Sequence, residues 1–216
     1  MLTVHHLATS QSERIVWLCE ELGVPYELKR YERRADNRLA PPEYKALHPM
    51  GIAPVITDGD LVLGESGAIV AYIVETYGGG RWVCKRGDAG FVDYLYWFHF
   101  ANGTLQPTLG RIMALERVDP SEKNVPLQGA KERLGLIFST ADKRLGEVPY
   151  FAGAALTAAD IMSVFSLTTM RLFRATDLSG YPNILAYLQR VGARAAYRQA
   201  MAKAEPGFTP MLEAIT

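Results

Sequence analysis

Apolar residues in the first part of the chain follow two different spacings in turn. Residues 2–6 and 26–31 alternate between apolar and polar positions, which is typical of strands. Between them, residues 12–22 carry apolar side chains at helical spacing, and Gly23 directly after them is a residue type that commonly ends a helix. The pattern therefore predicts a strand, a helix and a second strand in this order.

A second group of elements is predicted between residues 41 and 77. Two prolines open a short helical stretch at 41–47. Residues 54–57 and 61–63 are strand-like and flank Asp58-Gly59-Asp60, a sequence that favours a hairpin turn. Residues 66–77 have helical spacing and end at a run of glycines. Together these elements give an α/β domain with the order β-α-β-α-β-β-α.

The remainder of the chain is predicted to be helical. Residues 79–86 form a glycine-containing break, and strand patterns nearly vanish after it. Helical patterns then cover residues 89–115, 127–145, 158–172, 184–192 and 195–204. Pro107 is expected to kink the first of these helices. We therefore expect an α/β domain over 1–78, a linker at 79–86 and an all-helical domain over 87–216.

The composition limits the function classes that need consideration. Of the 216 residues, 49% are apolar and 21% charged, as is ordinary for a soluble globular protein. The 23 Lys and Arg balance the 23 Asp and Glu, so we expect no nucleic-acid or anionic-membrane surface, and self-association is permitted. The chain has neither a secretion-signal pattern nor a membrane-length apolar run, which predicts a cytoplasmic protein. Its cysteines and histidines lack metal-ligand spacing, so no metal site is expected.

Pro54 marks a candidate binding surface for a peptide. A proline cannot donate a ladder hydrogen bond, and a cis bond before it would force a tight turn. Such a turn would leave backbone groups of the preceding residues free to pair with an extended peptide at a sheet edge. Glu65 and Ser66 then open an apolar helix whose first N–H groups can receive a carboxylate. A short peptide with an amine and a carboxylate would fit this arrangement.

Several short motifs, each weak alone, occur in an order and at distances that resemble those of the glutathione S-transferase family. They are the stretch from Ser10 to Tyr26, His48-Pro49-Met50-Gly51, Ala53-Pro54-Val55, Glu65-Ser66-Gly67-Ala68-Ile69 and Leu156-Thr157-Ala158-Ala159-Asp160-Ile161. The resemblance covers essentially the whole chain and is greatest to the serine-type members of bacteria and fungi. It implies a thioredoxin-like amino-terminal domain, an all-helical second domain, glutathione as co-substrate and a homodimer.

The resemblance implies that a hydroxyl at the start of the first helix activates the thiol of glutathione. Lowering a thiol pKa of about 8.5 by about two units requires about 2.7 kcal/mol, which one hydrogen bond to the thiolate can supply. We assign this role to Ser10, with Thr9 and Ser12 as alternatives. A competing interpretation is a capping box, in which Ser10 caps the helix and Glu13 reaches back to it.

The resemblance also implies the contacts that hold glutathione. Ala53, before a cis Pro54, would pair its backbone with the cysteinyl part. Ser66 would receive the γ-glutamyl carboxylate and Glu65 would face the ammonium group. Ile52 departs from the family pattern, because many relatives carry a polar residue there, close to the glycyl carboxylate. Three residues are possible substitutes for that contact: His48, Arg38 and Lys45.

Residues of the second part are assigned to an apolar co-substrate pocket or to the framework. Phe91, Leu95, Phe98 and Leu105 are expected to face the core, whereas Tyr94, Trp97 and Thr104 would line the pocket near Ser10, with Arg111 at its rim. Thr157 and Asp160 are interpreted as a structural capping motif, with Leu156 and Ile161 as a hydrophobic staple.

The resulting hypothesis is a glutathione transferase that attacks small, mostly apolar electrophiles in detoxification. Two alternatives remain open from the sequence. One is a glutathione or ligand carrier without turnover, which Ile52 favours. The other is a glutathione-dependent peroxidase or isomerase, because these reactions use the same thiolate and differ in the apolar pocket.

Overall fold

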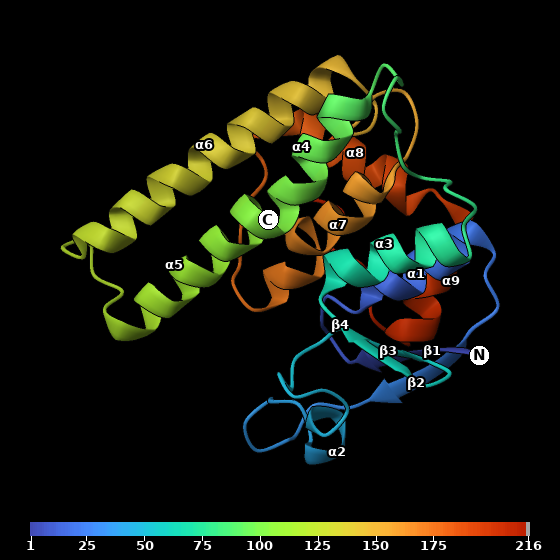
Figure 1. The fold of residues 1–216 in the computed structure, drawn as a ribbon. Coiled ribbons are helices and arrows are strands. Elements are labelled where there is room, and N and C mark those ends of the chain that lie inside the picture. Colours follow the sequence, from blue (N-terminus) through green and yellow to red (C-terminus); the bar gives the residue numbers. More distant parts are fainter. Residues whose placement is uncertain (215–216) are drawn as a thin grey trace.

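The computed structural model describes residues 1–214, and their amino-terminal part contains a mixed sheet of four strands (Figure 1). The strands are β1 (Leu2–Leu7), β2 (Glu27–Tyr31), β3 (Val55–Asp58) and β4 (Leu61–Gly64). They lie in the spatial order β2-β1-β3-β4. β2 runs parallel to β1, whereas β3 is antiparallel to β1 and β4 to β3. The predicted strands and hairpin are confirmed.

Helices cover both faces of this sheet. They are α1 (Glu13–Leu22), α2 (Pro42–Lys45) and α3 (Ser66–Thr76). α1 ends where Gly23 takes the left-handed conformation, with a φ of 67°. Side chains of β1 alternate between the faces, so Leu2 and Val4 join the core with α1 and α3, whereas Leu7 packs with Tyr44 of α2. The α/β order expected from the sequence is therefore confirmed.

Six α-helices and two short helical turns make up most of the second part, as far as it is described (to residue 214). The helices are α4 (Phe91–Phe100), α5 (Gln106–Val118), α6 (Val125–Glu147), α7 (Ala158–Leu167), α8 (Pro182–Gly192) and α9 (Ala195–Ala204). A π-helical turn, η1 (Ala101–Leu105), joins α4 to α5, and a 3₁₀ turn, η2 (Thr169–Leu172), follows α7. Pro107 lies in the first turn of α5, where its missing N–H costs no hydrogen bond. In Figure 1, α5 and α6 form an arm that extends away from the sheet.

The two parts share a continuous hydrophobic core. α1 contacts the sheet and α3, and it also contacts α7 and α9 of the second part. Trp17 of α1 meets Tyr197 of α9 edge to face, with ring centroids 5.2 Å apart. Residues 77–90 contain neither a helix nor a strand. The boundaries 1–78, 79–86 and 87–216 themselves stay a prediction.

The face of α4 that points into the core differs from the expected one. Trp97 is only 4% exposed and stacks on Phe151, with ring centroids 4.7 Å apart. Leu95, which was expected in the core, is 40% exposed. α4 is apolar on almost all sides, so its sequence pattern does not select one face. Contact with α7 decides which side is buried.

The capping motif at the start of α7 is confirmed as structural. The Thr157 side chain accepts a hydrogen bond from the Ala159 N–H, and Asp160 accepts one from the Thr157 N–H at 2.8 Å. Asp160 is fully buried, and burial raises the pKa of its carboxyl to about 6. Leu156 and Ile161 on either side of the cap are buried in the common core.

Candidate active site

The polypeptide before α1 forms one side of the candidate site. α1 starts at Glu13 with Ser12 at the N-cap position, so the predicted capping box between Ser10 and Glu13 is wrong. The helix begins two residues later than that box requires. The Glu13 carboxyl is buried instead and accepts a hydrogen bond from the Thr169 hydroxyl at 2.7 Å. Ser10 is therefore not the N-cap residue of α1, although its hydroxyl accepts a hydrogen bond from the Ser12 N–H at 3.3 Å.

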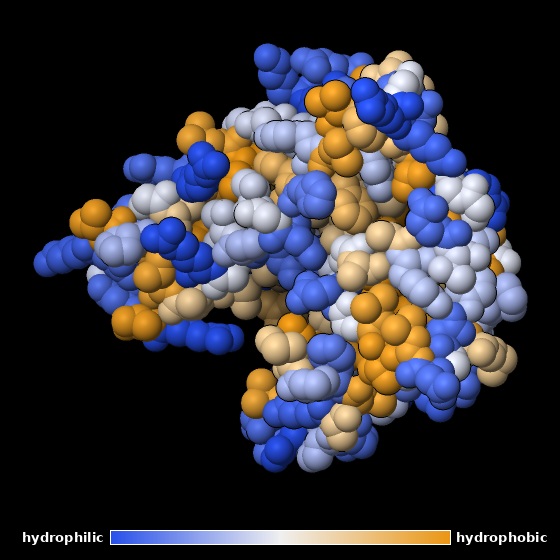
Figure 2. Space-filling view, viewed as in Figure 1, coloured by the Kyte–Doolittle hydropathy of each residue, from blue (hydrophilic) through white to orange (hydrophobic). Residues whose placement is uncertain are grey.

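Ser10 borders a cavity of about 460 Å³. Polar groups on its wall come from Thr9, Ser10, Gln11, Arg33, Lys45 and Gln106. Its apolar wall comes from Leu7, Leu39, Ala40, Ile52, Ala53, Phe165, Met170 and Phe173. Figure 2 shows the surface hollowed between the part that carries α2 and the arm of α5 and α6. The cavity thus combines a polar side with an apolar side, as a site for a polar and an apolar substrate requires.

The three candidate hydroxyls differ in their access to this cavity. Ser10 lines it and is 5% exposed. Thr9 also lines it, but its hydroxyl already accepts a hydrogen bond from Arg33 at 3.2 Å. Ser12 is completely buried and does not border the cavity, so its hydroxyl cannot touch a molecule bound there. Ser10 is the best placed of the three.

Ala53 lies two residues before β3 and is joined to Pro54 by a cis peptide bond. β3 is an interior strand, so the binding surface predicted at a sheet edge lies at the end of a central strand instead. The carbonyl of Ala53 accepts a hydrogen bond from the Gln11 side chain at 2.8 Å. Of the two backbone groups of Ala53 that could pair with a peptide, the carbonyl is therefore already bonded to Gln11, and the N–H is the other.

A buried arginine, Arg14, connects the predicted positions. Its Nη1 donates to Gln11 at 2.8 Å, to Ser66 at 3.2 Å and to Asn102 at 3.0 Å, and its Nη2 donates to Gln106 at 2.7 Å. Burial lowers the pKa of this guanidinium to about 9. Ala53 and Ser66 are thus linked through Gln11 and Arg14, neither of which was predicted. The sequence offered one signal for Arg14. It lies four positions before Leu18, and therefore on the same, apolar face of the helix.

Ser66 and Glu65 lie at the start of α3 as expected, with different surroundings. Ser66 is buried, and its hydroxyl accepts hydrogen bonds from Arg14 and from Asn102 at 2.8 Å. Glu65 is exposed and has a positive φ of 66°. A carboxylate reaching Ser66 would meet a hydroxyl that is already held by a cationic side chain.

The side of the cavity near Ile52 contains two cationic residues. Ile52 lines the cavity and is 48% exposed. Of the three substitutes expected for a polar contact, Lys45 lines the cavity, whereas His48 and Arg38 do not. Arg33, which was not predicted, lines it as well. Lys45 and Arg33 are therefore the cations available to a carboxylate at this end.

Comparisons with known proteins identify the family to which this chain belongs. The family models for the glutathione S-transferase N-terminal and C-terminal domains match residues 2–75 and 108–195. Glutathione S-transferase 3 of Schizosaccharomyces pombe is 34% identical over 95% of this chain and 88% of its own length. A crystal structure of a glutathione S-transferase from Actinobacillus pleuropneumoniae superposes with a TM-score of 0.86 at 33% identity, covering 95% of this chain and 93% of that one. The chain belongs to the glutathione S-transferase family.

Membership makes the protein a transferase with the two-part glutathione S-transferase fold. Glutathione S-transferase 1 of Saccharomyces cerevisiae is also similar, at 28% identity over 94% of this chain and 95% of its own length. Within residues 1–214, no group of three or more His, Cys, Asp or Glu side chains could hold a metal ion. In the same part of the chain no helix has the length and apolarity needed to cross a bilayer.

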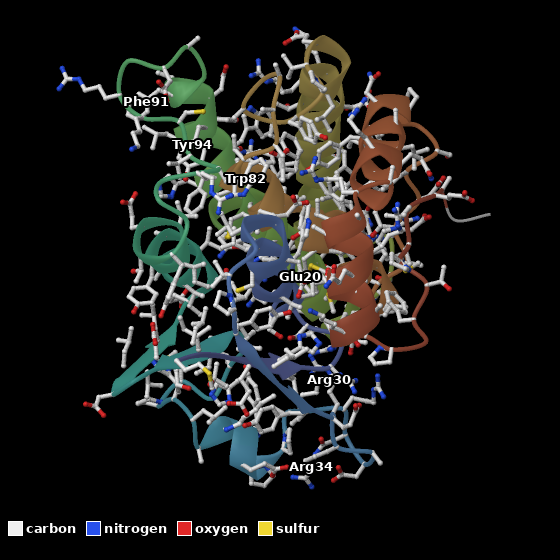
Figure 3. All side chains as sticks on the ribbon, turned by 90° about the vertical axis from the view of Figure 1, so that its right-hand side faces the viewer. Glu20, Arg30, Arg34, Trp82, Phe91 and Tyr94 are labelled. Atoms are coloured by element: carbon white, nitrogen blue, oxygen red, sulfur yellow. The ribbon has the colours of Figure 1, made fainter. Side chains whose placement is uncertain are left out.

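The four residues assigned to the co-substrate pocket of this glutathione S-transferase lie elsewhere in the described part of the chain. The residues that line the cavity do not include Tyr94, Trp97, Thr104 or Arg111. Trp97 is occupied by core packing against Phe151, and Arg111 is exposed on α5. Figure 3 shows Tyr94 beside Phe91 on α4, at the opposite end of the molecule from Arg34. The apolar wall comes from α7 and the segment after it instead, through Phe165, Met170 and Phe173.

Proposed function

We propose that this glutathione S-transferase conjugates the thiolate of glutathione to small, mostly apolar electrophiles in the cavity beside Ser10. The observation that carries the proposal is the position of Ser10, which lines the cavity two residues before the N-cap of α1. A hydroxyl donor and a helix N-terminus both favour an anion over its neutral form. The apolar wall then provides the surface on which an apolar electrophile can lie.

Glutathione would extend from the polar side of this cavity toward the start of α3, because Glu65 and Ser66 do not line the cavity themselves. Ala53 would offer its backbone N–H to the cysteinyl part, since its carbonyl is held by Gln11. Ser66 and Arg14 would lie at the γ-glutamyl end, with Glu65 toward the ammonium. Peroxide reduction and isomerisation would use the same thiolate, so products from different electrophiles are needed to separate them.

Replacing Ser10 with alanine is expected to slow conjugation by roughly 10- to 100-fold, because a hydrogen bond to a charged group contributes about 1.5–3 kcal/mol. The ultraviolet absorbance of the thiolate should fall in parallel when glutathione is titrated into the variant at neutral pH. Ser139→Ala, an exposed serine on α6, is the matched control and should behave as wild type.

The outcomes of this titration separate the candidate functions. Normal thiolate formation in the Ser10 variant would assign the role to Thr9 and contradict the proposal. Binding and thiolate formation without turnover of any electrophile would favour a ligand carrier. Absence of glutathione binding at millimolar concentration would contradict both.

Replacing Lys45 with alanine is expected to weaken glutathione binding about two- to fivefold, because an exposed ion pair contributes up to about 1 kcal/mol. The glycyl carboxylate would lose its partner near Ile52, while conjugation at saturating glutathione should stay unchanged. Calorimetric titration measures the dissociation constant, and Lys29→Ala on β2, away from the cavity, is the control. An unchanged dissociation constant in Lys45→Ala would contradict this prediction and indicate that Arg33 contacts the glycyl carboxylate instead.

The proposal includes a homodimer in the cytoplasm, with detoxification as its role. Two groups of exposed apolar side chains support self-association. Leu61 and Val62 lie on the edge strand β4, and Val92, Leu95 and Tyr96 lie on α4. Their removal from water in a dimer would be favourable.

A further inference from the structure

A buried chain of hydrogen bonds runs inward from Ser10. The Ser10 hydroxyl lies 2.7 Å from the Ser12 hydroxyl, which lies 2.8 Å from Nδ1 of His6. Nε2 of His6 lies 2.9 Å from the carboxylate of Glu205. We call these four residues the Ser10–Glu205 chain. Only its Ser10 end borders the cavity.

Three separate parts of the fold supply this chain. His6 is on the face of β1 that also carries Leu2 and Val4, so its ring points toward α1 and the core. Ser12 lies at the N-cap of α1, and Glu205 directly follows α9. His6 and Ser12 are completely buried and Glu205 is 6% exposed. A buried imidazole joined to a buried carboxylate is costly unless every polar atom is paired.

Hydrogen-bond accounting allows two arrangements of the protons. In the first, neutral His6 donates its Nε2–H to Glu205, Ser12 donates to Nδ1, and Ser10 donates to Ser12. In the second, His6 carries protons on both nitrogens, so Nδ1–H donates to Ser12, Ser12 donates to Ser10, and the Ser10 proton points into the cavity. Every bond of the chain is reversed except the one to Glu205.

Neighbouring backbone groups fit both arrangements. The Leu7 N–H donates to the Ser12 hydroxyl at 3.1 Å, and the Ser12 N–H donates to the Ser10 hydroxyl at 3.3 Å. Each serine oxygen therefore accepts two hydrogen bonds and donates one in either state, once a thiol or thiolate occupies the cavity. Neither arrangement leaves a buried donor or acceptor without a hydrogen bond. The change from one to the other therefore does not carry the energetic cost of an unpaired buried polar group.

We propose that the Ser10–Glu205 chain carries the thiol proton of bound glutathione to His6. The inference rests on the proposed function of Ser10. The thiol gives its proton to the Ser10 oxygen, Ser10 passes its own proton to Ser12, and Ser12 passes its own to Nδ1 of His6. The products are a thiolate that accepts a hydrogen bond from Ser10 and an imidazolium paired with Glu205.

Charge is conserved through the cycle. After the thioether forms, the proton returns along the same chain to the leaving group or to water in the cavity, and His6 is neutral again. Ser10 alone touches the sulfur, so Ser12, His6 and Glu205 are positioning residues that act through it. The relay also explains why Ser12 is a serine although it makes no capping hydrogen bond.

Charged and titratable groups from several elements lie around the His6 end of the chain. Glu205 is the carboxylate in direct contact, and it also accepts the Thr9 N–H. Glu13 on α1 is held neutral near pH 7, because burial raises its pKa to about 8. Arg33 lies near Glu205, and Arg30 of β2 donates to the carbonyl of Ala204 at 2.7 Å.

Counting the protons released when glutathione binds tests the relay in the unmodified protein. Calorimetric titration in buffers of different ionisation enthalpy gives the protons released, and ultraviolet absorbance gives the thiolate formed. The relay predicts far fewer than one proton released per thiolate, because the proton stays on His6. Release of one proton per thiolate would overturn the relay and leave the proposed function of Ser10 intact.

Variants locate the proton acceptor. Ser12→Ala interrupts the chain and should raise the pKa of the bound thiol by about one unit, which is about a tenfold change in its ionisation equilibrium and lowers the thiolate present at neutral pH. The remaining thiolate should then release a full proton. Ser12→Thr, which keeps the hydroxyl, should restore wild-type behaviour, and His6→Gln and Glu205→Gln should resemble Ser12→Ala.

A matched histidine serves as the control. His5 is also buried on β1, but its ring bonds to Tyr31 at 3.0 Å and to Thr57 at 3.1 Å, outside the chain. His5→Gln should therefore leave proton release unchanged. Wild-type thiolate and proton counts in folded Ser12→Ala would overturn the relay. Absence of thiolate in the wild type itself would overturn the proposed function as well.

Discussion

Replacing Asp160 with alanine is expected to lower the free energy of unfolding by about 4 kcal/mol, one of the largest effects a single substitution can have. The carboxylate accepts hydrogen bonds from the Phe151 N–H at 3.0 Å and the Tyr187 hydroxyl at 3.1 Å. It also accepts the N–H and the hydroxyl of Thr157, at 2.8 and 3.2 Å. Alanine leaves these buried donors unpaired, and each such donor costs about 1–3 kcal/mol. Urea unfolding followed by circular dichroism measures the loss.

Two milder variants show whether the unpaired donors cause the loss. Thr157→Ala removes the side-chain cap of α7 and one of the four donors to Asp160, and it should cost about 1 kcal/mol because no donor is left unpaired at Asp160. Asp160→Asn keeps one acceptor oxygen and should lie between the two. Equal losses in Thr157→Ala and Asp160→Ala would mean that Asp160 acts only as a cap.

Replacing Glu13 with glutamine is expected to stabilise the protein at neutral and mildly alkaline pH. Burial raises the pKa of the Glu13 carboxyl from 4.5 to about 8, so the folded protein retains a proton that the unfolded chain loses. Glutamine resembles the protonated acid in shape and can still accept the hydrogen bond from Thr169. The free energy of unfolding of Glu13→Gln should exceed that of the wild type by about 4 kcal/mol near pH 8. This follows because each pH unit over which the folded protein retains the proton costs the wild type about 1.4 kcal/mol.

The sign of the pH dependence follows from the number of protons bound in each state. Below pH 4.5 both states carry the proton, and the wild type and Glu13→Gln should be equally stable. Between pH 4.5 and about 8 the folded state binds more protons, so wild-type stability falls as the pH rises. Above this interval Glu13 is ionised in both states, and the difference in stability between the wild type and Glu13→Gln no longer changes with pH.

Chemical unfolding at several pH values checks this second prediction. The free energy of unfolding of Glu13→Gln should vary less with pH than that of the wild type. Glu147→Gln, at the exposed end of α6, is the control and should keep the wild-type dependence. Parallel curves for wild type and Glu13→Gln would show that Glu13 is ionised in the folded protein.

Local sequence patterns predicted the element order well, because each element carries its own signal. Gly23 ends α1, Asp58-Gly59-Asp60 forms the turn before β4, and the pattern at residues 195–204 coincides with α9. The same patterns failed for α4, where apolar side chains on almost all sides left the buried face undetermined. Tyr94 and Trp97 were therefore assigned to a cavity that α7 and its following segment line instead.

The polar connections of the candidate site could not be predicted from spacing. His6 and Glu205 are separated by 199 positions, and Arg14 and Gln106 by 92. Their contact depends on the packing of β1 and α1 against helices of the second part. Ser10, Ala53 and Ser66 were assigned to the site because the family resemblance specified their arrangement, and their roles stay a prediction. Gln11 and Arg14 were missed because a polar residue near a helix start usually faces solvent.

The contact between Thr9 and Glu205 has a consequence for the order in which the protein matures. The loop that carries Ser10 is held through the Thr9 N–H by a carboxylate 196 positions later in the chain. Although the sheet and α1 are synthesised early, that loop lacks its anchor until α9 and Glu205 have left the ribosome. A nascent chain with its first 78 residues already folded would therefore be unable to ionise a thiol efficiently. Reactivity would begin only after Glu205 has been synthesised and has bound the Thr9 N–H.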